Sequence, residues 1–261
     1  LGVIENGEVV DYREMIERLR REVLEYNVDF DFGYQTGRIE LLITGSGSNY
    51  SELENALHWI NLSLFHPYLE EDNLPRILDV LDQRMIELRN TMKGREEYWV
   101  SYPASTYRFQ DNPLFMSTRS FLTRTHHLHR LRLMLTTPGN GEDREELSAF
   151  IRSLKVTGAE KNRETLDEML QYLLNPESNV EREYDKLKNS IQDMSETGTG
   201  NVYYIIKALR STLPEIPDEN LSEDWVYLCN EIERDLLLKP SSVLGNMKHV
   251  LNLIRHSENV R

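Results

Sequence analysis

Apolar residues recur with helical spacing near the start of the chain. Between residues 11 and 24 they appear every three or four positions, and arginine and glutamate fill the positions between them. This spacing places one apolar stripe on an otherwise polar surface, which predicts an amphipathic surface helix. The residues of the stripe are Tyr12, Met15, Ile16, Leu19 and Val23.

The pattern then changes to a period of two over residues 26–32, which is typical of a half-buried β-strand. The glycines within 33–37 supply a turn, and residues 38–44 form the predicted partner strand. The sequence therefore predicts an antiparallel β-hairpin. Its first strand alternates Tyr26, Val28, Phe30 and Phe32 with Asn27, Asp29 and Asp31.

Helical spacing returns after the flexible stretch at residues 45–48. Ser51 and Glu54 have the spacing of a capping box, which predicts a helix from Ser51 to about Pro67. A second long helix is expected from about Asn73. Further short helices are predicted at 117–122 and 124–135.

A strong break follows at residues 138–141, where proline and glycine cluster. The sequence beyond it is polar, acidic and helical, and no segment favours a strand. We therefore expect an α+β fold that is predominantly helical, with a small antiparallel sheet packed against helices and an added helical region. The helices predicted in this second part are 142–154, 161–174, 177–195, 201–213, 222–238 and 241–256.

Charge and cysteine content narrow the possible functions. The 261 residues include 30 lysines and arginines against 44 aspartates and glutamates, a formal net charge of −14. Such a chain repels phosphate backbones and anionic lipids, so we expect no nucleic acid and no membrane among its partners. The single cysteine, Cys229, excludes a disulfide framework and a zinc ribbon.

Localisation is not predicted by the sequence. No apolar run is long enough to span a bilayer, and the first residues contain neither an initiator methionine nor a signal peptide. We therefore expect a fragment of a longer protein.

The histidines at residues 126–129 are a candidate metal site, because imidazole is a common zinc ligand. On a helix, however, His126 and His129 lie one turn apart while His127 faces elsewhere, and no carboxylate lies within a turn of them. Solvated histidines beside the neighbouring arginines are therefore favoured over a metal site. Those arginines are Arg124, Arg130 and Arg132.

Other residues with reactive or binding chemistry give weaker signals. Acidic neighbours raise the pKa of a thiol, so a buried structural role is favoured for Cys229 over a nucleophilic one. The glycine-rich stretch at 45–48 lacks the lysine and the spacing of a phosphate-binding loop. Carboxylate runs such as 70–72 are typical of solvated surfaces. The aromatic segment 98–109 could line a peptide-binding surface, although a core role is favoured.

Residues 50–115 resemble a segment of the insulinase-like zinc metallopeptidases, the pitrilysin or inverted zincin family that includes the presequence proteases. Residues 50–92 are similar to the family's helix, its junction of proline with apolar and acidic residues, and the long helix that follows. Residues 12–32 and 37–47 match the family's order of helix, strand and strand. Residues 243–261 are similar to the helix that leads into a domain's last strand.

This resemblance implies a division of the chain into two regions. Residues 1–135, completed by 241–261, would form a domain of the insulinase-like type. Residues 136–240 match nothing in the family pattern and are interpreted as a helical insertion.

The family's active site places zinc on two histidines of an HxxEH helix, whose glutamate activates water, and on a glutamate of a later helix. HxxEH is absent here. Counted from Pro67, the position of the third ligand falls on Arg84, whose guanidinium cannot ligate a cation, and the acid that accompanies it falls on Ile77. A shift of one turn would bring Glu87 to the place of the ligand. The resemblance therefore implies that no residue of this chain is catalytic or binds a metal or cofactor, and that zinc lies in another domain.

We therefore expect a non-catalytic domain of a large insulinase-like zinc metallopeptidase that helps to form a peptide-enclosing chamber. Its partners would be the other domains of the same peptidase and the peptide substrate, and the chain alone would hydrolyse no peptide. One alternative is a catalytically inactive scaffold or assembly subunit of the same fold. Another is a helical protein-interaction module centred on 142–238. Its partner-docking aromatic residues would be Tyr172, Tyr203, Tyr204, Trp225 and Tyr227.

Overall fold

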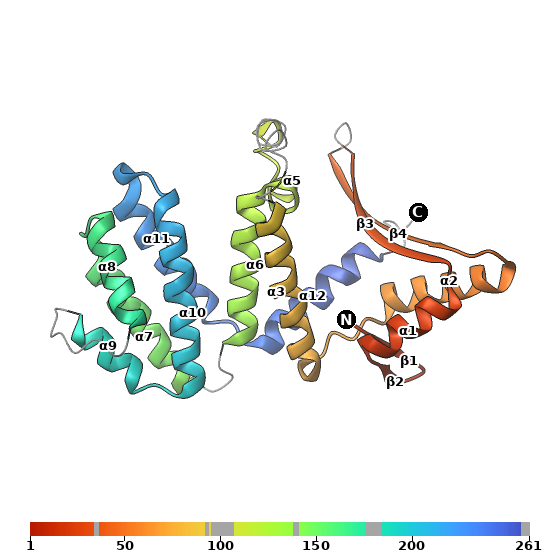
Figure 1. The fold of residues 1–261 in the computed structure, drawn as a ribbon, viewed down its shortest axis with the longest axis horizontal. Coiled ribbons are helices and arrows are strands. Elements are labelled where there is room, and N and C mark those ends of the chain that lie inside the picture. Colours follow the sequence, from red (N-terminus) through yellow and green to blue (C-terminus); the bar gives the residue numbers. More distant parts are fainter. Residues whose placement is uncertain (34–36, 92–93, 95–106, 138–140, 176–183, 257–261) are drawn as a thin grey trace. The chain divides into compact units, whose positions relative to one another are not determined.

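The computed structural model describes residues 1–33, 37–91, 94, 107–137, 141–175 and 184–256 (Figure 1). The chain divides into two units, one formed by Leu1–His127 with Leu244–Arg261 and the other by Leu128–Val243. Helices predominate in the described part, and its strands form two antiparallel sheets of two strands each. The expected predominantly helical α+β fold is therefore confirmed. The assignment of 1–135 with 241–261 to a peptidase-type domain, and of 136–240 to an insertion, stays a prediction.

The first unit begins with a short hairpin of β1 (Val3–Glu5) and β2 (Glu8–Val10). Asn6 and Gly7 connect the strands with φ angles of 52° and 85°. These positive angles suit a two-residue hairpin turn, for which Asn-Gly is the strongest sequence signal. Hydrophobic spacing did not predict this hairpin, but the dipeptide indicates it.

Helix α1 (Tyr12–Glu22) confirms the first predicted helix, and the Asp11 side chain caps its start. The predicted hairpin is confirmed as β3 (Glu25–Gly33) and β4 (Arg38–Ser46), which pair in antiparallel register. Gly45 and Ser46 belong to β4, whereas the sequence predicted a flexible stretch there. The strand extends because a residue without a side chain at position 45 lets β4 approach helix α2 (Tyr50–Phe65) closely: a Cβ on Gly45 would lie 2.8 Å from the Cβ of Ala56.

The start of α2 differs from the predicted capping box at Ser51 and Glu54. The side chain of Asn49 caps the helix by accepting a hydrogen bond of 3.0 Å from the backbone N–H of Glu52. The carboxylate of Glu52 reaches back to the backbone N–H of Ser48 at 2.6 Å. The box is therefore formed two residues earlier, because asparagine serves as an N-cap as well as serine does.

A small core joins β1, β2, α1 and α2. The Trp59 indole is buried at its centre and donates a hydrogen bond of 3.0 Å from Nε1 to the carboxylate of Glu22. This bond satisfies the one polar group of the ring. The buried apolar residues of the core are Val3, Val10, Leu19, Val23, Ala56, Trp59 and Leu62.

The rest of the first unit is helical. It contains α3 (Leu74–Thr91) after a short 3₁₀ turn (Glu71–Asn73), α5 (Pro113–Arg119), the first part of α6 (Phe121–Thr136) and most of α12 (Pro240–Ile254). The side chain of Asn112 caps α5, so this helix starts before the predicted residue 117. Helix α12 is tied to the unit by an ion pair of 2.7 Å between Lys248 and Glu70.

The second unit is a group of helices that run side by side (Figure 1): α7 (Gly141–Gly158), α8 (Arg163–Leu174), α9 (Asp185–Gln192), α10 (Glu196–Thr212) and α11 (Leu221–Asp235). Helix α10 starts earlier than predicted because the Ser195 hydroxyl accepts a hydrogen bond of 3.0 Å from the backbone N–H of Gly198. The stretch 198–200, predicted as a separator, therefore lies inside the helix.

The second unit has the larger apolar core, and Trp225 of α11 is fully buried in it. A Cβ on Gly158 would lie 2.5 Å from the ring of Trp225, so only glycine permits this approach of α7 and α11. The indole Nε1 donates to the carbonyl of Lys155 at 3.1 Å. Tyr172 is also buried in this core. The expectation that Tyr172 and Trp225 dock a partner is therefore wrong.

A buried ion pair joins α6 to α11 within the second unit. The guanidinium of Arg130 forms two hydrogen bonds of 2.8 Å with the carboxylate of Asp235, and a third of 2.9 Å with Glu231. Asp235 and Glu231 are both buried. Because breaking such a pair leaves a buried charge, it fixes the docking of the end of α6 on α11. Arg130 is thus a packing residue of the second unit.

Candidate functional site

The β3–β4 hairpin has one apolar and one polar face. Alternation along the strands and the register place cross-strand pairs such as Val28–Ile43 and Phe30–Leu41 on one face. The opposite face carries Asp29, opposite Leu42, and other polar residues. The remaining members of the apolar face are Tyr26, Phe32, Ile39 and Gly45, and those of the polar face are Glu25, Asn27, Asp31, Gly33, Arg38, Glu40, Thr44 and Ser46.

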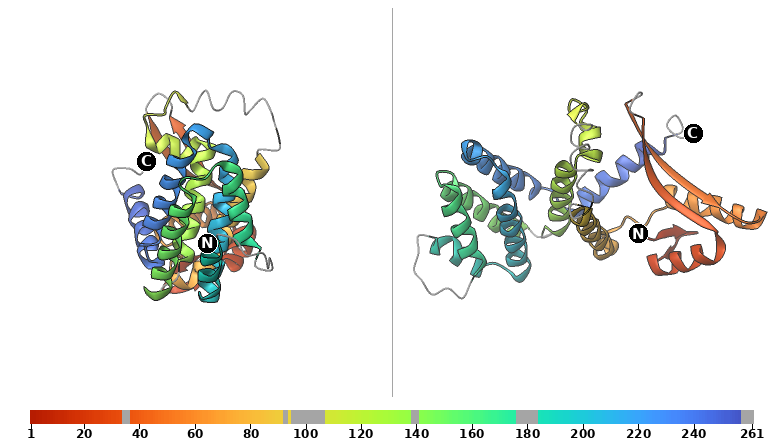
Figure 2. Two further views of the ribbon diagram at one scale, coloured as in Figure 1. Left: turned by 90° about the vertical axis from the view of Figure 1, so that its left-hand side faces the viewer. Right: turned by 45° about the horizontal axis from the view of Figure 1, so that its top comes forward.

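The ends of the apolar face are covered by the first unit. Gly45 packs on α2 at the base of the hairpin. Near the turn, the centre of the Phe32 ring lies 6.3 Å from that of the Phe115 ring. The Arg119 guanidinium lies over the Phe32 ring, 4.2 Å from its centre. Figures 1 and 2 show the turn end of the long hairpin extending away from α2.

The middle of the apolar face is open. Val28 is 51% exposed and Phe30 is 52% exposed. Leu42, on the polar face, is 51% exposed as well. Sequence spacing predicted that these strands bury one face, and this is wrong for Val28 and Phe30. Neighbouring apolar side chains exposed on a regular strand mark an interaction site more often than scattered surface residues do.

Helix α2 exposes a second apolar stripe beside the hairpin. Its buried face is formed by Ala56, Trp59 and Leu62, yet its apolar character extends around the helix. Tyr50, Leu53 and Leu57 are exposed and lie at successive turns of the same side. A helix that is apolar on two sides has a second surface available for contact.

Two aspartates cover backbone groups of β3. Asp29 accepts a hydrogen bond of 2.7 Å from the backbone N–H of Phe30, and Asp31 accepts one of 2.8 Å from that of Phe32. An N–H group that bonds its neighbour's side chain does not take part in strand pairing. These contacts therefore satisfy donors on the outer edge of β3, where an incoming strand would otherwise bind.

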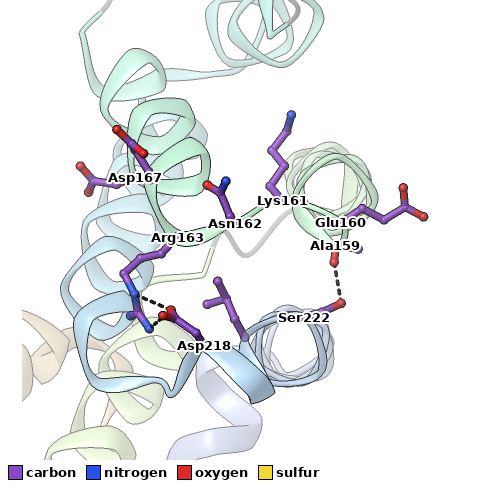
Figure 3. Close-up of a pocket in the computed structure, with 10 residues that line it drawn as sticks. Ala159, Glu160, Lys161, Asn162, Arg163, Asp167, Asp218 and Ser222 are labelled. Atoms are coloured by element: carbon purple, nitrogen blue, oxygen red, sulfur yellow. Dashed lines mark hydrogen bonds and ion pairs between the residues drawn. The ribbon is translucent and has the colours of Figure 1, made fainter.

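A surface depression of about 730 Å³ lies in the second unit, where the connection between α7 and α8 faces the start of α11 (Figure 3). The Arg163 guanidinium donates to the carboxylate of Asp218 and to the carbonyls of Leu213 and Ile216. The Ser222 hydroxyl donates to the carbonyl of Ala159. These groups tie the segments together, which indicates a structural role.

Two further polar residues that line the depression, Asn162 and Asp167, also have structural partners. Asn162 caps α8 by accepting a hydrogen bond of 2.9 Å from the backbone N–H of Thr165. The Arg210 guanidinium beside Asp167 lowers the pKa of that carboxyl through a hydrogen bond of 2.6 Å. The contacts of Asn162, Arg163, Asp167 and Ser222 are therefore those of paired charges, a helix cap and a tie between segments.

The position that the family resemblance assigns to the third zinc ligand lies on the surface of α3. Arg84 is exposed and forms an ion pair of 2.7 Å with Glu87, one turn further along. Ile77, at the position of the accompanying acid, is buried in an apolar contact face. A shift of one turn in the alignment with the family would place Glu87 at the ligand position, but its carboxylate is paired with the Arg84 guanidinium. These residues do not fit a zinc site.

The histidines of α6 do not form a metal site either. The rings of His126 and His127 lie 6.1 Å apart, and His129 Nδ1 is 2.7 Å from the hydroxyl of Tyr204. His129 therefore has a packing contact with α10 in place of the predicted solvation. Within the described ranges, no three His, Cys, Asp or Glu side chains are grouped so that they could hold a metal ion.

Cys229 is buried in the core of the second unit. The pKa of its thiol is raised to about 12, and burial is the largest cause. The charge of Lys155 lowers this pKa, and that of Glu233 raises it. A thiol that is neutral and inaccessible is not a nucleophile. The predicted burial of Cys229 is confirmed.

Two further expectations concern other parts of the chain. Most of the aromatic segment 98–109 lies outside the described residues; of its end, Tyr107 is exposed and the Phe109 ring stacks on Phe115 at 4.9 Å. The helices of the described part include none long and apolar enough to cross a membrane.

Comparisons with known proteins add no family assignment. No protein-family model, no curated protein and no solved structure matches this chain.

Proposed function

We propose that this chain is a non-catalytic domain of a large insulinase-like zinc metallopeptidase, in which it forms part of the wall of a peptide-enclosing chamber and contacts the peptide. The family link rests on the resemblance of residues 50–115 and of the flanking segments. Zinc and hydrolysis are assigned to another domain, because Arg84 stands at the position of the third ligand and pairs with Glu87.

One observation carries the peptide-binding part of the proposal: the open middle of the apolar hairpin face. Val28 and Phe30 are half exposed there, and β3 and β4 are each 9 residues long. A long, regular surface of this kind suits an extended peptide, whose side chains alternate with the same period as those of the strands. The exposed stripe of α2 at Leu53 and Leu57 adds apolar surface to the same unit.

Charge indicates the kind of peptide. The polar face of the hairpin carries Glu25, Asp29, Asp31 and Glu40 against the single cation Arg38. The whole chain has a formal net charge of −14. Basic peptides are therefore attracted and acidic peptides repelled, with an effect on association rate that weakens as salt is added. A peptide with basic and apolar residues fits this surface best.

The test combines binding with hydrolysis. A fluorescein-labelled, 9-residue peptide that alternates leucine with lysine, matched in length to β4, is titrated with the chain and followed by fluorescence anisotropy. We expect saturable binding that Phe30→Asp weakens, whereas Leu237→Asp, a similar change at an exposed leucine of the second unit, leaves it unchanged. Mass spectrometry should find the peptide intact with or without added zinc. Cleavage that a chelator abolishes would overturn the non-catalytic assignment.

The rival proposal of a scaffold or assembly subunit predicts a different result. Such a subunit needs the apolar surfaces for permanent contacts with other chains, so free peptides would not compete for them. Absence of peptide binding together with an intact fold would favour the scaffold.

A further inference from the structure

Helix α12 differs from the rest of the chain in its charge. Residues 239–256 include Lys239, Lys248 and Arg255 and no aspartate or glutamate, although acidic residues outnumber basic ones by 44 to 30 in the whole chain. From Leu244 onward this helix belongs to the first unit, as the acidic hairpin does. It combines apolar with basic residues, which is the composition that the hairpin surface favours in a peptide.

The apolar stripe of α12 is covered at its start and open toward its end. Val243, Met247, Val250 and Ile254 follow one another at the spacing of a single helix face. Val243 is buried, whereas Val250 is 54% exposed and Ile254 is 41% exposed. The second half of the stripe is therefore available for a further contact.

Polar contacts hold α12 in its present position. Lys248 pairs with Glu70 at 2.7 Å, and Arg255 donates a hydrogen bond of 2.8 Å to the carbonyl of Phe65. With about 3.6 residues per turn, these two cations lie roughly 130° around the helix from the open stripe. Both side chains of the ion pair are exposed, and exposed pairs contribute little to stability. Helix α12 is therefore held by contacts that are easily exchanged.

The open parts of α12 and of the hairpin begin near the same end of α2. The base of the apolar hairpin face, where Gly45 pairs with Tyr26, rests on α2 at Ile60. The α12 contact at Phe65 is five residues beyond Ile60, about 7.5 Å along the helix. Val28 is two residues beyond Tyr26, about 7 Å along β3. The two open apolar surfaces are therefore within reach of each other in the first unit.

We propose that α12 closes over the middle of the apolar hairpin face as an internal competitor of the peptide, so that the chain regulates its own peptide binding. This inference rests on the proposed function, since it concerns what covers the same surface when no peptide is bound. In the closed state, Val250 and Ile254 pack on Val28 and Phe30. Closure thereby removes apolar surface of both elements from water, which is its driving force.

The basic side chains of α12 take new partners in the closed state. The carboxylates of Asp29 and Asp31 bind backbone N–H groups on the outer edge of β3, so they lie at the border of the apolar face. Lys248 and Arg255 share one flank of the α12 stripe, so they reach this edge when the stripe packs on the hairpin. The exchange of Glu70 for two carboxylates favours closure, and a basic peptide that takes the same carboxylates opposes it.

Variants of α12 and of its present partner shift the balance in opposite directions. Val250→Asn with Ile254→Asn makes the stripe polar without changing the charge. It should bind the leucine–lysine peptide about threefold more tightly, which corresponds to a wild-type chain that is open in about one molecule of three. Glu70→Ala releases Lys248 for closure and should weaken peptide binding about twofold.

Matched controls separate closure from general effects of these substitutions. Val156→Asn with Leu237→Asn makes the same kind of change at exposed residues of the second unit, and Glu71→Ala removes an exposed charge beside Glu70. Both should bind the peptide like wild type. Equal affinity of the chain with and without the substitutions at 250 and 254 would overturn the proposal.

Cross-linking tests closure in the absence of peptide. In Val28→Cys with Val250→Cys, the two thiols meet when α12 closes, and a short bismaleimide links them within one chain. Val28→Cys with Asn252→Cys, on the opposite side of α12, should link far less. Cys229 is buried and does not compete for the reagent. Mass spectrometry of the intact chain should show fewer links as peptide is added; equal linking by both pairs, or links only between two copies, would overturn the proposal.

The outcomes separate the two levels of the account. If neither wild type nor any variant binds the peptide, the proposed function fails and the competition fails with it. If the peptide binds but the polar stripe gives no tighter binding, the role of α12 fails while peptide binding stands. Far-UV circular dichroism confirms that each variant is folded, and the cross-linking pair decides the matter if the variant with a polar stripe is not.

Discussion

The Asp29 carboxylate accepts a hydrogen bond of 2.7 Å from the backbone N–H of Phe30. Asp31 repeats this contact with Phe32 two residues later, so a pair of acidic side chains lies along one edge of an exposed hairpin. An uncovered strand edge is a template for pairing with other chains, and charged side chains are a common protection against it. The aspartates thus protect an edge beside an open apolar face.

Removing this protection should cause self-association. In the double variant Asp29→Ala with Asp31→Ala, the N–H groups of Phe30 and Phe32 lose their side-chain acceptors, so the edge of β3 can pair with a strand of another copy. Sedimentation velocity should show larger species whose fraction rises with protein concentration. Glu54→Ala with Asp79→Ala removes the same charge from exposed helical positions and should sediment like wild type. Identical profiles for the two double variants would contradict the protective role.

The contact of Gly158 with Trp225 gives a prediction for stability. Gly158→Ala places a methyl group 2.5 Å from the buried indole, so it should lower the free energy of unfolding by about 1–3 kcal/mol. Gly200→Ala is the matched control, because its methyl group meets no atom within 4 Å inside α10. There alanine should stabilise the helix by about 0.5–1 kcal/mol. Urea unfolding followed by circular dichroism measures both, and a change of the same sign in both variants would refute the packing argument.

The ion pairs of the chain should differ strongly in their importance. Arg130→Met leaves the buried carboxylates of Asp235 and Glu231 without their cationic partner, and should cost about 3 kcal/mol of unfolding free energy. Glu87→Ala breaks the exposed pair with Arg84 and should cost less than about 1 kcal/mol. Chemical denaturation of the two variants decides this. Equal losses would mean that burial does not set the strength of these pairs.

Acid sensitivity should include a contribution from Glu5. A hydrogen bond of 2.7 Å with His58, and the nearby Arg18, lower the pKa of Glu5 below its usual 4.5. Since the folded state binds this proton less readily than the unfolded state, the contribution is complete above pH 4.5 and is lost as pH falls through the lower folded pKa. Glu5→Gln should therefore reduce stability at neutral pH and flatten its decline in acid. Thermal melts across this range test the expectation, with Glu54→Gln on α2 as the control; a decline as steep as in wild type would contradict it.

The sequence predicted the hairpin that carries the candidate site because Tyr26–Phe32 alternates strictly, and the period of two is a property of the strand itself. It did not predict that Val28 and Phe30 stay half exposed. A period shows which residues share a face, whereas covering that face depends on elements distant along the chain. Periodicity did not predict the hydrogen bonds of Asp29 and Asp31 to the backbone either, because these bonds depend on which N–H groups of β3 point away from β4.

Helix boundaries followed local chemistry that hydrophobic spacing overlooks. Asn49 and Ser195 cap α2 and α10, so both helices start before their apolar residues do. The glycines at 198 and 200 were interpreted as a break, yet both lie inside α10, because Ser195 caps the helix before them and the following residues Val202 and Ile205 are buried in the core. Packing of the helix thus outweighs the low helix propensity of glycine. Asn6–Gly7 is the opposite case, since the dipeptide alone indicates the β1–β2 turn.

Hydrogen–deuterium exchange of the full chain, with and without the leucine–lysine peptide, tests the central claim most directly. The account predicts slower exchange of hairpin amides around Val28 and Phe30 when peptide is present, and unchanged exchange around the depression between α7 and α8. Protection confined to that depression, or no protection of the hairpin by a peptide that binds, would contradict the assignment of the hairpin as the peptide-binding surface.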